Sequence, residues 1–200
     1  MDQKFDKENW YKRLLEISSD ENLMRRYSSL EKLHCEALSF YVPAIEKLNS
    51  KTSSAIIPDG RTKADVIAHI MGWEEWQIEV FTDKDREKRL KEQIKLRNYY
   101  DPEEKAHLDF AVVIEFNAYQ SKKYVKWDWD KLQKKAKSVA YQLKSLFPPE
   151  PLSDWINFLE NTPICHWKIL PDKTISIPAG WYLWMVSLEH EMVEHRIDLF

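Results

Sequence analysis

Apolar residues recur at three- and four-residue steps along most of this chain, from about Asp20 onward. Such spacing places the apolar side chains on one face of an α-helix. The first run predicts a long helix, which Pro43 should kink or divide, because proline cannot donate the helical hydrogen bond. The positions on this face, one histidine among them, are Leu23, Tyr27, Leu30, His34, Ala37, Leu38, Tyr41, Ile45 and Leu48.

Glycine is scarce, with three residues among 200. This scarcity argues against a glycine-rich phosphate loop, a Rossmann turn or a series of tight hairpins. Helix-start signals are frequent instead. Thr62 and Asp65 have the spacing of a capping box and predict a second helix that ends near Val80. The charged stretch 82–100 predicts a helical extension or connector.

Further start signals divide the second half of the chain. Asp101 is predicted to cap a helix that ends near Tyr124, and Asp128 to cap the next one. A short helix is expected at 153–161, and the last helix should begin near Pro178 and run to the end of the chain. No segment convincingly predicts a strand, so the expected fold class is all-α: a bundle of about four main helices with additional N-terminal and connecting helices.

Charge and cysteine content exclude several kinds of protein. The 30 basic and 33 acidic residues give a formal net charge of -3, which does not favour nucleic acid or an anionic membrane as a partner. The two cysteines, Cys35 and Cys165, form no metal-binding spacing and suit free thiols in a reducing compartment. No secretory signal and no apolar run long enough for a membrane span is present. We therefore expect a cytoplasmic protein.

The last helix carries titratable residues on its apolar face. At about 100° per residue, His195 shares a stripe with four apolar residues and with Trp184, and Glu191 lies at its margin. Glu191 and His195 are one helical turn apart and can address one metal ion. His190 is expected on the opposite side, with Val186, Val193 and Ile197. An N-terminal helix or a dimer partner would cover that side.

His69 occupies a similar position on the second helix, sharing a face with Trp73 and Trp76, while Gly72 leaves room beside it. One histidine from one helix and a carboxylate–imidazole pair from another resemble an open zinc shell. We therefore predict a divalent metal, zinc or nickel, with His69, Glu191 and His195 as ligands, and no further catalytic residue is identified. The alternative is that the histidines satisfy one another in a structural core, while Glu191 pairs with Arg196 or with a lysine on a neighbouring helix.

A binding pocket for a small-molecule substrate is expected beside these ligands. Its predicted lining residues are His34, Trp73, Trp76, Trp184 and Leu188. Packing in the core is the simpler explanation for the tryptophans, and His34 is read as a core or pocket-lining residue and not as a catalytic one. Asp198 is open to two interpretations, as support for a metal ligand or as a solvated carboxylate.

Two passages resemble the DinB/YfiT-like superfamily of helical-bundle metalloenzymes: "TKADVIAHIMGWEEW" and, at the last helix, "EHEMVEHRIDL". Many members carry His-x-x-x-His in the second passage, where this chain has Glu191 and His195. That departure is similar to the mycothiol-dependent maleylpyruvate isomerase-like branch, whose last helix reads Glu-x-x-x-His followed by Asp-Leu. The resemblance implies a DinB-like four-helix bundle over residues 21–200, with residues 1–20 as an N-terminal helical extension.

The resemblance also implies an activity. In that branch the metal ligands would be His69, Glu191 and His195, and a low-molecular-weight thiol held on the metal would serve a transferase or isomerase acting on a small electrophile. A second likeness, carried by "EFNAYQSKKYVKWDWDKLQKKAKSVAYQLKSL", is to the ClbS/DfsB-type four-helix proteins. It implies a metal-free protein that binds a small molecule and confers self-resistance. The remaining alternative is a purely structural bundle.

Overall fold

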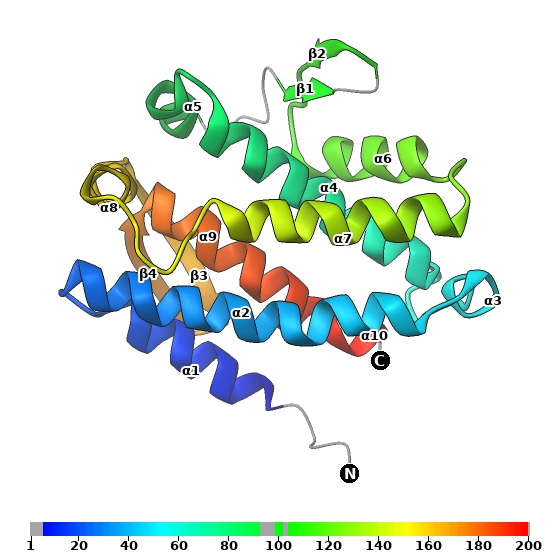
Figure 1. The fold of residues 1–200 in the computed structure, drawn as a ribbon, viewed down its shortest axis with the longest axis horizontal. Coiled ribbons are helices and arrows are strands. Elements are labelled where there is room, and N and C mark those ends of the chain that lie inside the picture. Colours follow the sequence, from blue (N-terminus) through cyan, green and yellow to red (C-terminus); the bar gives the residue numbers. More distant parts are fainter. Residues whose placement is uncertain (1–5, 93–98, 102–103, 200) are drawn as a thin grey trace.

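The computed structural model describes residues 6–92, 99–101 and 104–199. The described chain is mostly helical, with two small two-stranded sheets. Four long helices form its centre: α2 (Leu23–Lys47), α4 (Lys63–Thr82), α7 (Trp129–Ser145) and α9 (Ala179–Glu189). Helices α2 and α4 each pack against both α7 and α9, which closes a four-helix arrangement around one apolar core (Figure 1). The expected bundle of four main helices is therefore present.

Further helices surround this bundle. Helix α1 (Lys7–Ser18) packs on α2, α6 (Val113–Tyr124) on α4, and α8 (Ser153–Glu160) on α9. Two more, α3 (Ser50–Ser53) and α5 (Arg86–Glu92), flank α4 in sequence. Residues 93–98 of the charged stretch that was predicted as a connector lie outside the described part of the chain. The last helix continues from α9 through a π-helical turn, η1 (His190–Glu194), into α10 (Arg196–Leu199).

Helix caps explain where the bundle helices begin. Thr62 and Asp65 form the predicted capping box of α4, and the Asp128 side chain accepts a hydrogen bond from the backbone N–H of Lys131 at the start of α7. Both predictions are confirmed. Of the two outcomes expected at Pro43, division of the first helix is wrong, because α2 continues through it, and a kink stays a prediction. Pro43 lies on the exposed face of α2, where water can hydrate the carbonyl group that loses its partner.

The expectation of no strands is also wrong. Strands β1 (Tyr99–Asp101) and β2 (Ala106–Leu108) form one antiparallel hairpin, and β3 (Ile164–Leu170) and β4 (Lys173–Pro178) form another. In β3 the side chains of Cys165, Trp167 and Ile169 are buried, and the alternate residues are more exposed. This two-residue periodicity fits a half-buried strand and not a helix. Asp101 consequently ends β1 and does not cap a helix, since α6 begins only at Val113.

The N-terminal helix does not cover the outer side of the last helix as far as Ile197, whose side chain is 84% exposed. Helix α1 reaches α9 through Tyr11, whose hydroxyl donates a hydrogen bond to Glu189 over 3.0 Å. Within the described residues, none of the helices combines the length and the apolar character needed to cross a bilayer.

Candidate metal centre

A change of helix type brings two histidines of the C-terminal segment together. The backbone N–H of His195 donates to the carbonyl oxygen of His190 over 3.2 Å, across five residues, in the π-helical turn η1. A π-turn contains one more residue than an α-turn and therefore rotates the following side chains to another face. The rings of His190 and His195 consequently lie on the same side, with their centres 4.9 Å apart.

Helix α4 adds a third imidazole to this pair. The ring of His69 is centred 4.8 Å from that of His190 and 5.2 Å from that of His195. The Nε2 atoms of His69 and His190 are 3.0 Å apart. One nitrogen from each of the three residues lies within 4.8 Å of the other two. We call His69, His190 and His195 the histidine cluster.

The histidine cluster differs from the ligand set expected from the sequence in one member. His69 and His195 do converge, but the third member is His190, which the α-helical projection had placed on the opposite side. That projection is wrong because it assumed an uninterrupted α-helix through residues 190–195. Glu191 turns into the core instead, where it is 2% exposed and lies beside the equally buried Glu74.

The environment keeps the histidine cluster suited to metal binding. Burial lowers the pKa of His69 to about 4 and that of His190 well below its usual value, with smaller contributions from neighbouring histidines and Arg61. Both rings are therefore neutral at neutral pH, the form in which imidazole binds metals. In His195, Nδ1 lies 3.0 Å from a carboxylate oxygen of Asp198. This contact leaves Nε2 of His195 as its ligand atom, as in carboxylate–histidine–metal arrangements.

The spacing of the rings can be compared with that of a metal site. A tetrahedral zinc ion, with Zn–N distances of about 2.1 Å, holds imidazole rings with their centres about 5 Å apart. The three observed separations are 4.8, 4.9 and 5.2 Å. Three imidazole nitrogens thus have ring spacings that fit a zinc-type shell with one position left for water or substrate.

A cavity of about 410 Å³ adjoins the histidine cluster, within the range of small-molecule sites. His69 and His190 form part of its wall. Its other lining residues come from α4, α6, α9 and η1, and are Trp73, Trp76, Gln77, Val113, Asn117, Tyr182, Leu183, Val186, Glu189 and Glu194. The indole N–H of Trp73 donates to the side-chain oxygen of Asn117 over 3.0 Å, which fixes one ring of this wall.

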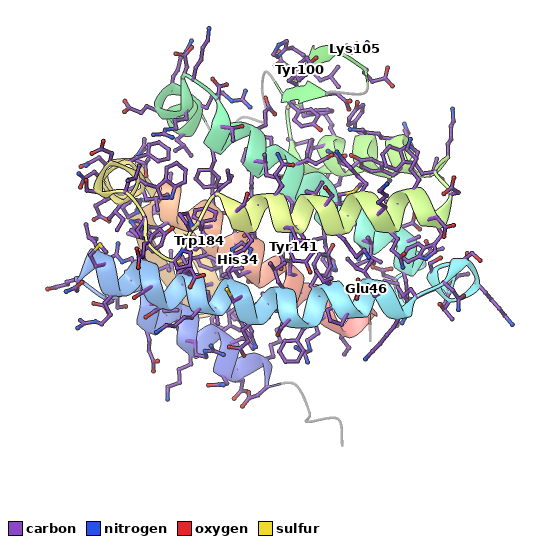
Figure 2. The ribbon with its side chains drawn as sticks, in the orientation of Figure 1. His34, Glu46, Tyr100, Lys105, Tyr141 and Trp184 are labelled. Atoms are coloured by element: carbon purple, nitrogen blue, oxygen red, sulfur yellow. The ribbon has the colours of Figure 1, made fainter. Side chains whose placement is uncertain are left out.

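Two of the five predicted lining residues, Trp73 and Trp76, line this cavity. His34, Trp184 and Leu188 do not, since they are fully buried in the bundle core. Figure 2 shows His34 and Trp184 facing each other between α2 and α9, where the Trp184 indole N–H donates to Nδ1 of His34 over 3.0 Å. Their role is packing, one of the two interpretations that the sequence allowed.

The room expected beside His69 at Gly72 is also occupied. A Cβ atom at Gly72 would lie 2.6 Å from the side-chain carbon Cδ of Gln120 on α6. Gly72 therefore lets α6 approach α4 closely. The space left by the missing side chain serves helix packing and not the histidine cluster.

Glu189 is a cavity residue that the sequence analysis missed. It is 7% exposed, and its carboxylate accepts the hydrogen bond from Tyr11 on the N-terminal helix. Burial raises the pKa of Glu189 to about 7, and the nearby Glu194 contributes to this rise. Glu189 directly precedes the π-turn and Glu194 is its last residue, so an α-helical projection could not place them together. The only available signal was a glutamate directly after the apolar run of α9.

Comparison of the chain with protein-family models, with curated proteins and with solved structures finds no match.

Proposed function

We propose that this protein is a metal-dependent enzyme that acts on a small electrophilic molecule at the histidine cluster. The observation that carries the proposal is the convergence of three imidazoles, two of which line a cavity of about 410 Å³. We further propose that the bundle is of the DinB type and that the protein works in the cytoplasm. Cys35 and Cys165 form no disulfide in the part of the chain that the structure describes, which suits such a reducing compartment.

His69, His190 and His195 would hold the ion, for which zinc and nickel both suit three nitrogen ligands. A divalent ion so bound lowers the pKa of a coordinated water or thiol and thereby supplies a nucleophile at neutral pH. Asp198 orients His195 through Nδ1, and the cavity accommodates the substrate next to His69 and His190. A transferase or isomerase that uses a low-molecular-weight thiol is the reaction class that we propose.

Metal binding is tested with protein purified without chelator and then titrated with zinc against a competing dye. We expect one zinc per chain, and a loss of affinity of more than about 100-fold when His69, His190 or His195 is replaced by alanine. His166→Ala is the matched control, because His166 is an exposed histidine on β3. Zinc binding that is absent, or that persists in all three cluster variants, contradicts the proposal.

Glu191→Gln distinguishes between two ligand sets, the histidine cluster and the set predicted from the sequence, in which Glu191 takes the place of His190. The structure predicts that this variant retains zinc, because Glu191 faces Glu74 in the core. Loss of zinc in Glu191→Gln together with retention in His190→Ala would instead support the ligand set read from an uninterrupted α-helix.

The reaction class is tested with a panel of small electrophiles, including epoxides, activated alkenes and nitroaryl halides, with and without glutathione. Turnover should require zinc and be absent in His190→Ala. The second candidate is metal-free binding and self-resistance, which the aromatic wall formed by Trp73, Trp76 and Tyr182 favours. Ligand binding that survives chelation, without turnover of any panel member in the zinc-loaded protein, would support that candidate.

A further inference from the structure

The cavity beside the histidine cluster has two chemically different walls. One wall is apolar and largely aromatic, with Trp73, Trp76, Tyr182, Leu183 and Val186. Trp73 and Trp76 meet edge to face with their ring centres 5.6 Å apart, and Asn117 holds the Trp73 indole in place. Such a wall suits a flat or apolar body and also attracts cations to the faces of its rings.

The other wall carries negative charge. Glu189 and Glu194 both line the cavity, and no Lys or Arg side chain is among its described lining residues. Glu194 lies toward the solvent, with its side chain 52% exposed and its carboxylate 3.4 Å from Nε2 of His190. Glu189 lies deeper, held by Tyr11, and Lys7 of α1 is close to it from outside the cavity lining. A cationic group in the cavity would be attracted to these carboxylates, whereas an anionic group would be repelled.

Gln77 gives independent evidence of a ligand with hydrogen-bond donors. Its side chain is part of the cavity wall and 3% exposed, yet its oxygen Oε1 has no hydrogen-bond partner among the described residues. A buried amide oxygen without a partner costs free energy. An N–H donor brought by a ligand would remove that cost.

We propose that the cavity binds a small molecule with a protonated amine at one end and an apolar body of about the size of one ring. The amine lies at Glu189 and Glu194, and the body lies against Trp73 and Trp76. This inference rests on the proposed function, because it takes the cavity next to the histidine cluster as the substrate site. It adds the substrate class: an electrophile that carries a basic nitrogen.

Three probes with a common phenyl body isolate the head group: 2-phenylethylamine, 2-phenylethanol and 3-phenylpropionate. Their affinities are measured by calorimetry on the full chain at pH 8 with a chelator, where the amine is still protonated. We expect the amine to bind at least about tenfold more tightly than the alcohol, because charge-assisted hydrogen bonds are the stronger ones. The carboxylate should bind most weakly. Equal affinities, tighter binding of the carboxylate, or no binding of any probe would overturn the proposal.

Glu189→Gln should bring the amine-to-alcohol affinity ratio close to one, while the affinity for the alcohol stays within about twofold. The ratio within one variant is independent of small changes in stability. Glu16→Gln is the matched control, because Glu16 is an exposed glutamate on α1 that faces Lys12. A ratio unchanged in Glu189→Gln would contradict the proposal. Because the chelator removes metal, these results do not depend on zinc binding, and a failed zinc titration would overturn the proposed function alone.

Discussion

His190 and His195 are joined by a backbone hydrogen bond across five residues, and this one bond places both imidazoles beside His69. In an uninterrupted α-helix the two side chains would point about 140° apart. The π-turn brings the two side chains to the same side of the helix and at the same time turns Glu191 into the core. A single extra residue in one turn therefore decides which side chains form the candidate metal centre.

Asp198 is predicted to contribute to metal affinity through His195. Its carboxylate lies 3.0 Å from Nδ1 of His195, so it fixes the ring orientation and makes the other nitrogen a better ligand. Asp198→Ala should weaken zinc binding by about 10- to 100-fold without abolishing it. Competition with a zinc-binding dye measures this change. Asp172→Ala, on the exposed turn between β3 and β4, is the control, and equal affinities of the two variants would refute the role of Asp198.

Neighbouring glutamates on α4 should respond in opposite directions to the same substitution. Glu74 is 1% exposed and lies beside Glu191, and burial with this neighbour raises the pKa of Glu74 well above its usual value. The folded state therefore holds a proton that the unfolded chain has released, and stability is lost as the pH rises above the ordinary carboxyl range. Glu74→Gln should raise the unfolding free energy at pH 8 by at least about 1 kcal/mol.

Glu75→Gln is the comparison for that prediction. The Glu75 carboxylate lies 3.0 Å from Nζ of Lys135 and accepts a hydrogen bond from the Tyr124 hydroxyl. Its neutralisation weakens the ion pair with Lys135, whose side chain is 37% exposed, and should lower the unfolding free energy by about 1 kcal/mol. Urea unfolding at pH 6 and pH 8 measures both variants. If Glu74→Gln lowered the unfolding free energy instead, the ionised carboxylates of Glu74 and Glu191 would be stabilised by groups that are not among the described residues.

Acid should destabilise the protein through its buried histidines. Burial lowers the pKa of His34 to about 3, against 6.5 in the unfolded chain. The unfolded state therefore binds a proton below pH 6.5 that the folded state takes up only near pH 3. Between pH 7 and pH 5 this difference removes about 2 kcal/mol of unfolding free energy. In His34→Gln the side-chain oxygen can still accept the hydrogen bond from the Trp184 indole N–H. Between pH 7 and pH 5 the unfolding free energy of this variant should therefore fall by about 2 kcal/mol less than that of the unsubstituted protein. The control His166→Gln should show the same dependence of the unfolding free energy on pH as the unsubstituted protein.

The sequence predicted the helical bundle well, because its helices depend on local signals. The cap at Asp128 and the apolar stripe Leu132, Ala136, Val139 and Leu143 are sufficient to define α7 without reference to the rest of the fold. The strand β3 was missed although "ICHWKIL" alternates. Its pattern is short, and the composition of the chain favoured helices.

The candidate metal centre was predictable only in part. His69 and His195 follow from the α-helical projection, because each lies among apolar residues on its own helix. His190 does not, because the projection assumes an uninterrupted α-helix and residues 190–194 form a π-turn. No local signal in residues 189–195 distinguishes a π-turn from an α-turn, so the third imidazole could not be identified from the sequence.

A buried ion pair should anchor the cavity wall contributed by α6. Asp101, at the end of β1, is fully buried and lies 2.9 Å from Nζ of Lys123 on α6, and it also accepts a hydrogen bond from the Tyr119 hydroxyl. Asp101→Asn leaves Lys123 as a buried charge with less compensation, which should cost about 3 kcal/mol of unfolding free energy. Because α6 carries Val113 and Asn117, this variant should also weaken binding of 2-phenylethylamine. Adding Lys123→Met to Asp101→Asn should recover most of the stability, since the uncompensated charge is then gone. A double variant no more stable than Asp101→Asn would show that Asp101 acts mainly through Tyr119.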